Sequence, residues 1–292
     1  MPTSVKIDFI VPGFSKCGTT TLCALLELHP EVYIPPIKEP WYFSHKNFET
    51  QHEHYDGHYA AARQGQLKGD GSTDYTGYLR EDIAIERIHE NNPDCRFIFI
   101  ARNPKKRIES SYREMHHSGV LFGLNAPFSI GDCLRVFPQM VQDTLYWERI
   151  NKYRQKFGDE AILVVFLEDL KADQAGTLGR CFEHIGLDIK DVADTSTVNL
   201  NAGQAKLYDT RLFRFLRTNS VSGPRLARLT GPEQDKIFAP LRLRRVFGKK
   251  PLQWDETSVD TFQHEVVPDC LKFLEFYGKQ PDFWGLERKV AG

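Results

Sequence analysis

The residues best suited to chemistry in this chain lie near its start, in the stretch GFSKCGTTT. Gly13 and Gly18 enclose Lys16, and the hydroxyl residues Thr19 and Thr20 follow directly. Glycines allow a tight turn, and the free amides at the start of a helix point towards a bound anion. Because an apolar run precedes the stretch and a helical pattern follows it, we predict a phosphate-binding loop between a strand and a helix.

The order of residues in this loop differs from that of an ATPase. A Walker A loop places its lysine directly after the second glycine, whereas Thr19 occupies that position here and Lys16 precedes Gly18 by two residues. An ATPase also needs a strand that ends in aspartate to hold Mg²⁺, but the comparable run RFIFIAR ends in Arg102. The loop therefore predicts a nucleotide site without MgATP, and an ATP-dependent small-molecule kinase is the alternative from another enzyme class.

Two further motifs accompany the loop. IFIARNPKKRIESSY places Ser110 eight residues after Arg102, and PPIKEPWYFS places Glu39 ahead of an aromatic pair. With the loop, in this order, they resemble sulfotransferases that use 3′-phosphoadenosine 5′-phosphosulfate (PAPS), in particular bacterial members similar to the Golgi, heparan-sulfate type that acts on carbohydrates. The segments GDGSTDYTGYL and PLQWDE to PDFW are similar as well, so the resemblance covers most of the chain.

The resemblance implies roles for individual residues. Glu39 would act as the general base that takes the proton of the acceptor during in-line attack on sulfur. Lys16 would neutralise charge on the bridging oxygen as adenosine 3′,5′-bisphosphate (PAP) leaves. Arg102, a planar cation with several donors, suits the 3′-phosphate, and Ser111 is a rival to Ser110. The residues implied to contact the nucleotide are Ser15, Lys16, Cys17, Gly18, Thr19, Thr20, Arg102 and Ser110.

The predicted activity is that of a PAPS-dependent sulfotransferase, of EC 2.8.2 type, that needs no metal. Its acceptor is expected to be a hydroxyl, less readily an amine, of a sugar or glycan, since Glu39 and its aromatic neighbours resemble the carbohydrate-acting branch. A lipid, polyketide or other small-molecule hydroxyl is the alternative acceptor. A catalytically silent PAP-binding protein is the alternative outside the enzymes.

One segment departs from the family pattern. Many carbohydrate-acting members carry a second catalytic lysine after the next strand, and Gly71 stands at that place here. Asp70 and Tyr75 in the same segment remain similar and, with His54, are the residues that we expect to contact the substrate. Lys68 lies nearby, and alternation along its strand decides whether it faces the site.

Apolar runs alternate with helical patterns over the first 187 residues. We expect strands at 5–11, 31–34, 66–69, 96–101 and 161–166, and helices at 19–28, 80–90, 104–118, 138–157 and 170–185. The near-continuous apolar runs RFIFIA and AILVVFL are typical of strands buried on both faces of a parallel sheet. The pattern predicts an α/β fold with a central parallel sheet flanked by helices, related in layout to P-loop kinases.

The strand signal fades from residue 188 onward. We therefore expect a single sulfotransferase domain, 1–292, with an α/β core at 5–187 and a helical C-terminal portion at 188–292. A long final helix is expected at 257–277. Lys206 and Arg211 are the candidates for a loop that covers the cofactor. An amphipathic helix is also expected in this portion, with apolar positions at Leu207, Leu212, Phe215 and Leu216.

Composition excludes some classes of protein. The 292 residues include 38 Lys and Arg against 39 Asp and Glu, which argues against a dedicated nucleic-acid binder. No apolar run approaches the ~20 residues that span a bilayer, and the first residues do not have the pattern of a signal peptide. We expect a soluble protein whose partner is a small-molecule or glycan acceptor. The sequence does not indicate an oligomeric state.

Cysteine and histidine usage gives the last expectations. The six cysteines are scattered without CxxC spacing, which predicts buried thiols in a reducing compartment and hence a cytoplasmic location. No metal site is expected. Four histidines gather in one segment, but no cysteine or HExxH pattern accompanies them, so a solvated loop is the default interpretation. They are His45, His52, His54 and His58.

Overall fold

The computed structural model describes residues 3–119, 123–188, 206–247 and 252–286. Its internal contacts divide the chain into two compact units. The first comprises Met1–Pro104, Val141–Leu200 and Gln263–Gly292, and the second comprises Lys105–Met140 and Asn201–Phe262. That the whole chain is one domain stays a prediction. Within the described ranges, none of the helices has the length and apolar character that crossing a membrane requires.

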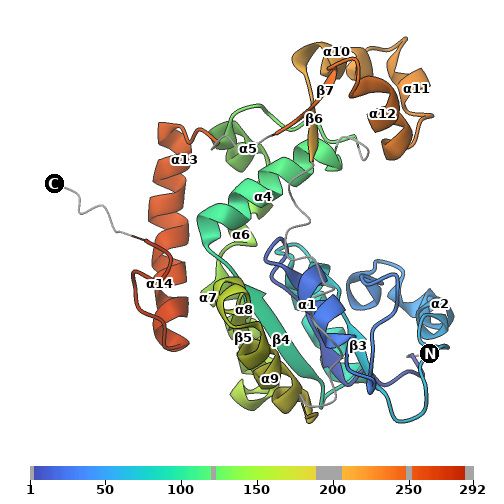
Figure 1. Cartoon of the computed structure of the whole chain (residues 1–292), viewed down its shortest axis with the longest axis vertical. Coiled ribbons are helices and arrows are strands. Elements are labelled where there is room, and N and C mark those ends of the chain that lie inside the picture. Colours follow the sequence, from blue (N-terminus) through green and yellow to red (C-terminus); the bar gives the residue numbers. More distant parts are fainter. Residues whose placement is uncertain (1–2, 120–122, 189–205, 248–251, 287–292) are drawn as a thin grey trace. The chain divides into compact units, whose positions relative to one another are not determined.

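A five-stranded parallel sheet forms the centre of the first unit, in the order β2-β3-β1-β4-β5. Figure 1 labels β3, β4 and β5 among its strands. Phe9 in the central strand lies opposite Gly69 on one side and Arg96 on the other. The parallel sheet predicted from the sequence is confirmed, and the fourth strand has the predicted bounds. The strands are β1 (Phe9–Ile10), β2 (Val32–Tyr33), β3 (Leu67–Asp70), β4 (Arg96–Ala101) and β5 (Ile162–Phe166).

Helices cover this sheet in two groups. The connection from β1 to β2 runs in one direction along the sheet, and that from β3 to β4 runs in the other. Because such crossovers are right-handed, α1 and α3 lie on opposite faces; α1 packs against α9, and α3 against α7. The helices are α1 (Thr19–Leu26), α2 (His52–Gly57), α3 (Glu81–Asn91), α7 (Tyr146–Phe157), α8 (Leu167–Ala172), α9 (Gln174–Ile185) and α14 (Val267–Phe276), with short 3₁₀ turns at η1 (Tyr42–Ser44), η2 (Phe48–Thr50), η3 (Thr73–Thr76) and η5 (Asp159–Ala161).

The strand order reverses at β1, and this position determines where a ligand can bind. In open α/β sheets, ligands bind outside the carboxyl ends of the strands at such a reversal. The loop of residues 11–18 leaves the carboxyl end of β1, and Arg102 follows the carboxyl end of β4. The sheet therefore brings the predicted loop and the predicted arginine to one edge.

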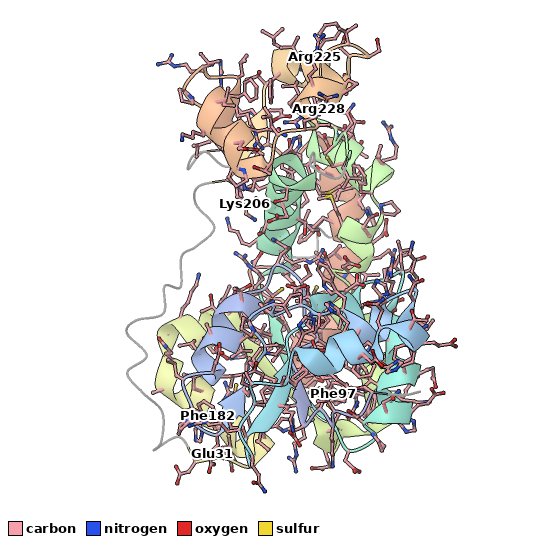
Figure 2. The ribbon with its side chains drawn as sticks, turned by 90° about the vertical axis from the view of Figure 1, so that its right-hand side faces the viewer. Glu31, Phe97, Phe182, Lys206, Arg225 and Arg228 are labelled. Carbon is pink, nitrogen blue, oxygen red and sulfur yellow. The ribbon has the colours of Figure 1, made fainter. Side chains whose placement is uncertain are left out.

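Aromatic side chains fill the interior of the first unit. Phe9, Phe97 and Phe99 are fully buried, and Figure 2 shows Phe97 and Phe182 among the packed side chains. Burial of each such ring stabilises the fold by roughly 1.5–3 kcal/mol. A side chain on Gly69 would overlap the Phe9 ring, which explains why glycine occupies the middle of strand β3.

Two of the predicted helices are each broken into a pair. The range 138–157 contains α6 (Gln139–Gln142) and α7, and the two carboxylate oxygens of Asp269 accept the amides of Trp147 and Glu148 at the start of α7. The range 170–185 contains the end of α8 and all of α9, which begins where Asp173 accepts the amide of Gly176 at 2.9 Å. Both corrections have one cause: a carboxylate cap begins a new helix.

The predicted final helix also differs from the structure. Residues 256–276 form α13 (Glu256–Thr261) in the second unit, a π-helical turn at Phe262–Val266, and α14 in the first unit. Pro268 lies at the start of α14 and has no amide hydrogen to donate to the carbonyl four residues earlier. A wider turn at this point accommodates the missing bond.

The second unit contains a pair of strands that the sequence pattern does not predict. Strands β6 and β7 are antiparallel, and Asp209 lies opposite Arg244. The fully buried Asp209 carboxylate lies 2.7 Å from the Arg217 Nε and 2.9 Å from the Arg244 Nε. The elements are α4 (Pro104–His117), α5 (Ile130–Val136), β6 (Leu207–Asp209), α10 (Arg211–Thr218), α11 (Gly223–Leu226), α12 (Gly231–Phe238), β7 (Arg244–Val246) and α13.

The predicted apolar face of α10 is wrong. Leu212 and Phe215 are 61% and 62% exposed, and the helix instead buries Phe213 and Arg214. Phe213 packs on Phe238 with ring centroids 4.5 Å apart. A guanidinium thus lies on the buried face of this helix, where its Nη1 donates to the Ala126 carbonyl and its Nη2 to the His116 Nδ1.

Candidate active site

The loop between β1 and α1 is held to the sheet by its backbone. The amide of Phe14 donates to the carbonyl of Ile100 at 2.9 Å, and the amide of Ile100 donates to the carbonyl of Gly13 at 2.8 Å. A side chain on Gly13 would overlap the Thr76 hydroxyl, which donates to the Pro12 carbonyl at 2.9 Å. Gly13 is therefore required for this close approach.

The second half of the loop turns into the start of α1. Lys16 and Gly18 both have left-handed backbone conformations, with φ of 66° and 105°. Gly18 is the residue that precedes the helix, and no side chain caps the helix N-terminus. The first amides of a helix have no intrahelical partner, so those that follow Gly18 are suited to a phosphate. Thr19 is buried and Thr20 is exposed beside them.

Arg102 is tied to the same loop. Its Nη1 donates to the Lys16 carbonyl at 3.1 Å, and its own carbonyl accepts the Tyr146 hydroxyl at 2.9 Å. The Tyr146 hydroxyl also lies 3.3 Å from the Cys17 sulfur. The Arg102 Nε is buried and has no hydrogen-bond partner among the described residues. The structure thus brings Lys16, Cys17 and Arg102 together, as the sequence predicts.

Glu39 is half-buried and surrounded by donors. Its Oε1 lies 2.8 Å from the Lys38 ammonium, and its Oε2 accepts bonds of 3.0 Å from the Trp41 indole and the Thr73 hydroxyl. Burial alone would raise the pKa of Glu39, but the charge of Lys38 and the three hydrogen bonds outweigh it, so this pKa lies below its ordinary value. The carboxylate is therefore ionised at neutral pH, as a general base must be.

An unusual backbone turn carries Glu39. Lys38 and Trp41 both have φ of 52°, in the left-handed region that L-residues rarely adopt. The Trp41 amide donates to the Ser72 hydroxyl at 3.0 Å, which fixes the turn to the segment after β3. Side chains of adjacent residues ordinarily point apart in extended backbone. The left-handed turn allows those of Lys38 and Glu39 to meet.

Lys38 also lies at this site, although no sequence motif marks it. Its ammonium donates to Glu39, to the Gly71 carbonyl at 3.2 Å and, in a longer contact of 3.5 Å, to the Thr19 hydroxyl. It thereby links the Glu39 turn to the start of α1. The only signal in the sequence is its adjacency to Glu39, which has no meaning until the backbone conformation is known.

The segment after β3 is organised around Asp70. This fully buried carboxylate accepts hydrogen bonds from the Ser72 amide and hydroxyl at 2.9 and 2.6 Å, and from the hydroxyls of Tyr55 and Tyr75 at 2.9 and 2.8 Å. Burial raises the pKa of Asp70 in spite of these bonds. Asp70 and Tyr75 are both fully buried. Their direct contact with a substrate stays a prediction; the bonds that they make hold the segment that carries Thr73.

A hollow of about 370 Å³ adjoins Glu39 in the first unit. Trp41, His45 and His54 line it, and Trp41 is 50% exposed. The His54 and His58 rings lie 4.6 Å apart, and burial together with His54 holds the pKa of His58 below its ordinary value. His54 thus lines the same hollow as Glu39, while its contact with a substrate stays a prediction.

Other predicted contacts belong to the second unit. Ser110 is half-buried in α4, Lys206 forms an ion pair with Glu114, and the Arg211 guanidinium lies 5.6 Å from the centroid of the Phe128 ring. The cofactor-binding roles assigned to them stay predictions, as does that of Ser15 in the loop. Among the described residues there is no group of three or more histidine, cysteine or carboxylate side chains placed to hold a metal.

The fold and these features define a class of α/β protein with a glycine-containing loop suited to phosphate and, in the same unit, an ionised carboxylate, Glu39. Comparison with known families then identifies the group. The model of the sulfotransferase domain matches residues 6–222. The chain therefore belongs to the sulfotransferase domain family.

Relatives in sequence are distant and longer. Heparan sulfate glucosamine 3-O-sulfotransferase 6 of Mus musculus is 26% identical over 188 residues, covering 61% of this chain and 52% of the relative. Carbohydrate sulfotransferase 15 of Homo sapiens is 24% identical over 247 residues, covering 61% of this chain and 43% of the relative. The chain thus spans about half the length of these relatives or less.

Solved structures show the same fold. A sulfotransferase from Alicyclobacillus acidocaldarius is 22% identical with a TM-score of 0.56, covering 77% of this chain and 94% of the other. The sulfotransferase domain from the curacin biosynthetic pathway is 16% identical with a TM-score of 0.50, covering 90% and 96%. The predicted sulfotransferase fold is confirmed.

Proposed function

We propose that this protein is a PAPS-dependent sulfotransferase that transfers a sulfuryl group to a hydroxyl of a sugar or glycan. The observation that carries the proposal is the combination of two features in the first unit. A carboxylate that stays ionised, Glu39, adjoins a hollow, and its partner Lys38 contacts Thr19 at the start of the phosphate loop helix. A general base linked to an anion-binding loop is what sulfuryl transfer to a hydroxyl requires.

The residues present fit the nucleotide. The uncapped start of α1 offers amides to the 5′-phosphate end. The buried Arg102 Nε, which has no partner among the described residues, is a charged donor suited to the extra 3′-phosphate. When bound, PAPS supplies the sulfuryl group and a leaving group, PAP, that departs without further covalent chemistry.

The chain's own residues would handle the proton and the charge. Glu39 would take the proton of the acceptor hydroxyl; PAPS would supply the sulfuryl group that the acceptor oxygen then binds, with PAP as the leaving group that keeps the electron pair of the broken bond. Proton transfer by a positioned base contributes about 10²–10⁴-fold to such rates. Lys16 contributes positive charge from within the loop, where it opposes the negative charge that develops on the leaving oxygen.

The lining of the hollow supports a sugar as the acceptor. Trp41 presents half of its surface to solvent beside Glu39, and the hollow combines aromatic faces with a few polar groups. Such a mixture of flat apolar walls and convergent polar atoms is typical of small-molecule sites. We also propose a cytoplasmic location, which is supported by six free, buried cysteines.

Calorimetric titration of the purified protein with PAP in EDTA, alongside ADP, tests the nucleotide assignment. We expect PAP to bind far more tightly than ADP, because only PAP carries a 3′-phosphate. Arg102→Ala should weaken PAP binding by about 10- to 100-fold through loss of charge-assisted hydrogen bonds. It should weaken ADP binding much less, because ADP has no 3′-phosphate and loses only the support that Arg102 gives to the Lys16 carbonyl. Lys16→Ala should weaken both.

Arg96→Ala is the matched control, since Arg96 lies at the opposite end of the same strand, β4, and is exposed. It should bind PAP like the wild type. Equal binding of PAP and ADP, or binding that needs Mg²⁺, would overturn the proposed function in favour of a kinase. Once PAP binding is established, a panel of sugar, lipid and polyketide hydroxyls with labelled PAPS identifies the acceptor.

A further inference from the structure

The position of the family's second lysine leaves little room for a side chain in this protein. A Cβ built on Gly71 would lie 2.9 Å from the Cys23 sulfur, 3.2 Å from the Lys38 carbonyl oxygen and 3.3 Å from the Lys38 Cγ. Cys23 is buried, and the Lys38 contacts are backbone and the inner part of its side chain. A side chain at this position would force its neighbours to shift, and Lys38 is one of the residues packed against it.

The ammonium of Lys38 occupies a defined place. It meets three oxygens from three different segments: the Glu39 carboxylate at 2.8 Å, the Gly71 carbonyl at 3.2 Å and the Thr19 hydroxyl at 3.5 Å. The side chain is only 18% exposed. A lysine on a freely solvated surface rarely loses so much freedom, because ordering its long side chain is entropically unfavourable.

We propose that Lys38 supplies the second cation of this site from the residue next to the base, in place of the lysine that Gly71 replaces. This inference rests on the proposed function. Lys38 is a positioning residue that acts through Glu39: it keeps the carboxylate ionised and directs Oε1, while Trp41 and Thr73 hold Oε2. When Glu39 takes the proton of the acceptor, it becomes neutral, and the adjacent ammonium is left with its charge unopposed beside the start of α1.

Two features of the geometry support a functional role over a merely structural ion pair. An isolated, partly exposed ion pair contributes little to folding. Lys38 nevertheless adopts a left-handed backbone conformation, φ 52°, which is unfavourable for a residue with a side chain. Unfavourable backbone at a polar cluster is typical of sites where orientation matters more than stability.

The test compares Lys38→Met, Lys38→Arg and Lys6→Met with the wild type. The first removes the charge with little loss of length, the second keeps the charge, and the third removes an exposed lysine that lies before β1. The first readout uses the ligand-free protein: the Glu39 carboxyl is titrated by NMR of carboxyl-labelled protein, with Glu39→Gln for assignment. We expect the pKa of Glu39 to rise in Lys38→Met and to stay near the wild-type value in the other two.

The second readout separates binding from turnover. In Lys38→Met we expect kcat to fall about 10- to 100-fold and its acidic limb to move to higher pH, while PAP affinity changes less than about threefold. Lys38→Arg should restore most of the rate. An unchanged Glu39 pKa in Lys38→Met, or full turnover with an unshifted pH profile, overturns the role of Lys38. Failure of the wild type to bind PAP would instead overturn the proposed function, and the carboxyl titration would still decide whether Lys38 controls Glu39.

Discussion

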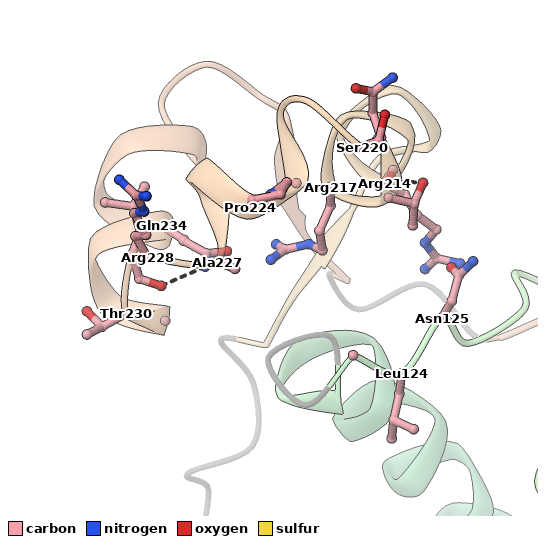
Figure 3. A pocket seen from close by; sticks show the side chains of 16 residues that line it. Leu124, Asn125, Arg214, Arg217, Ser220, Pro224, Ala227, Arg228, Thr230 and Gln234 are labelled. Carbon is pink, nitrogen blue, oxygen red and sulfur yellow. Dashed lines mark hydrogen bonds between the residues drawn. The ribbon is translucent and has the colours of Figure 1, made fainter.

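Each unit of this protein contains a hollow lined by apolar and charged side chains, and a comparison of one hollow from each unit shows how differently their charges are used. The hollow of the first unit, about 370 Å³, adjoins a carboxylate on which an ammonium, an indole and a hydroxyl converge. One hollow of the second unit is larger, about 740 Å³, and Arg214, Arg217 and Arg228 line it (Figure 3). Two of these arginines are engaged in holding the fold: Arg217 pairs with Asp209 at 2.7 Å, and Arg214 bonds to His116 at 2.9 Å.

The difference teaches that the size of a hollow is a poor guide to function. The convergence of an ionised carboxylate, a cation and unusual backbone beside the smaller hollow is the feature that indicates chemistry. The sequence adds a second contrast, because the second unit holds 17 Lys and Arg against 9 Asp and Glu, while the rest of the chain holds 21 against 30. The net charge of the whole chain, −1, does not reveal this asymmetry. Arg225 and Arg228 carry part of the excess to the surface of the second unit (Figure 2).

Replacement of Glu39 should have the largest effect and would test the first half of this comparison. We expect Glu39→Gln to lower turnover by about 10²–10⁴-fold, since the amide cannot accept a proton. PAP affinity and melting temperature should change little, because the half-exposed side chain keeps its length. Initial rates with labelled PAPS and the acceptor from the screen measure the loss.

Glu31→Gln is the matched control for this prediction. Glu31 is exposed and precedes β2, at the amino end of that strand. It should retain the wild-type rate. A Glu39→Gln enzyme with normal turnover would remove the chemical distinction between the two hollows.

The pH dependence of stability tests the role of a buried histidine, His116, in the second unit. The His116 ring is buried, with Nε2 donating to the Pro127 carbonyl at 3.0 Å and Nδ1 accepting from Arg214 at 2.9 Å. Burial and the Arg214 charge lower the pKa of His116 to about 4, against opposing effects of the Pro127 bond and Asp209. Between pH 6.5 and 4, the unfolded chain therefore binds a proton at His116 more readily than the folded protein does. The free energy of unfolding should fall by about 1–3 kcal/mol as the pH is lowered through this range.

Thermal unfolding of the wild type and His116→Asn across this pH range measures the effect. The variant should be less stable at pH 7 but should show a shallower decline on acidification. His52→Gln, a histidine of the first unit, is the control and should keep the wild-type slope. If the stability of the wild type and of His116→Asn declined with pH at the same slope, protonation of His116 beside Arg214 would not be the cause of the decline.

Removal of one hydroxyl beside Glu39 should give the smallest effect. Thr73→Ala deletes a single donor to the Glu39 Oε2 and should lower turnover by about two- to tenfold. Thr50→Ala, which removes an exposed hydroxyl bonded to the Asn47 carbonyl, should leave turnover unchanged. A Thr73→Ala loss as large as that of Glu39→Gln would show that the carboxylate is positioned by this one bond and not by the converging set.

Much of the first unit can be predicted from the sequence because its signals are local. Apolar runs such as RFIFIA mark buried strands, and the glycines of the loop mark its turn. Lys16, Arg102 and the β3 segment then meet at one edge because parallel strands bring their carboxyl ends together.

What the sequence does not predict depends on distant partners or on backbone torsions. Asp269 binds the first amides of α7 from more than a hundred residues away. Arg214 is buried in α10, where the Ala126 carbonyl and the His116 ring accept its hydrogen bonds. Lys38 meets Glu39 only because its own φ is positive. No pattern of residue types encodes these three outcomes by itself.

The left-handed backbone at Lys38 has a consequence for attempts to improve this protein. Glycine at that position would relieve roughly 1 kcal/mol of unfavourable backbone energy, and it would also delete the ammonium beside Glu39. Selection for heat resistance and selection for catalysis would therefore favour different residues at position 38. Laboratory evolution guided by melting temperature alone would therefore favour a more stable protein without the ammonium that the proposed mechanism needs.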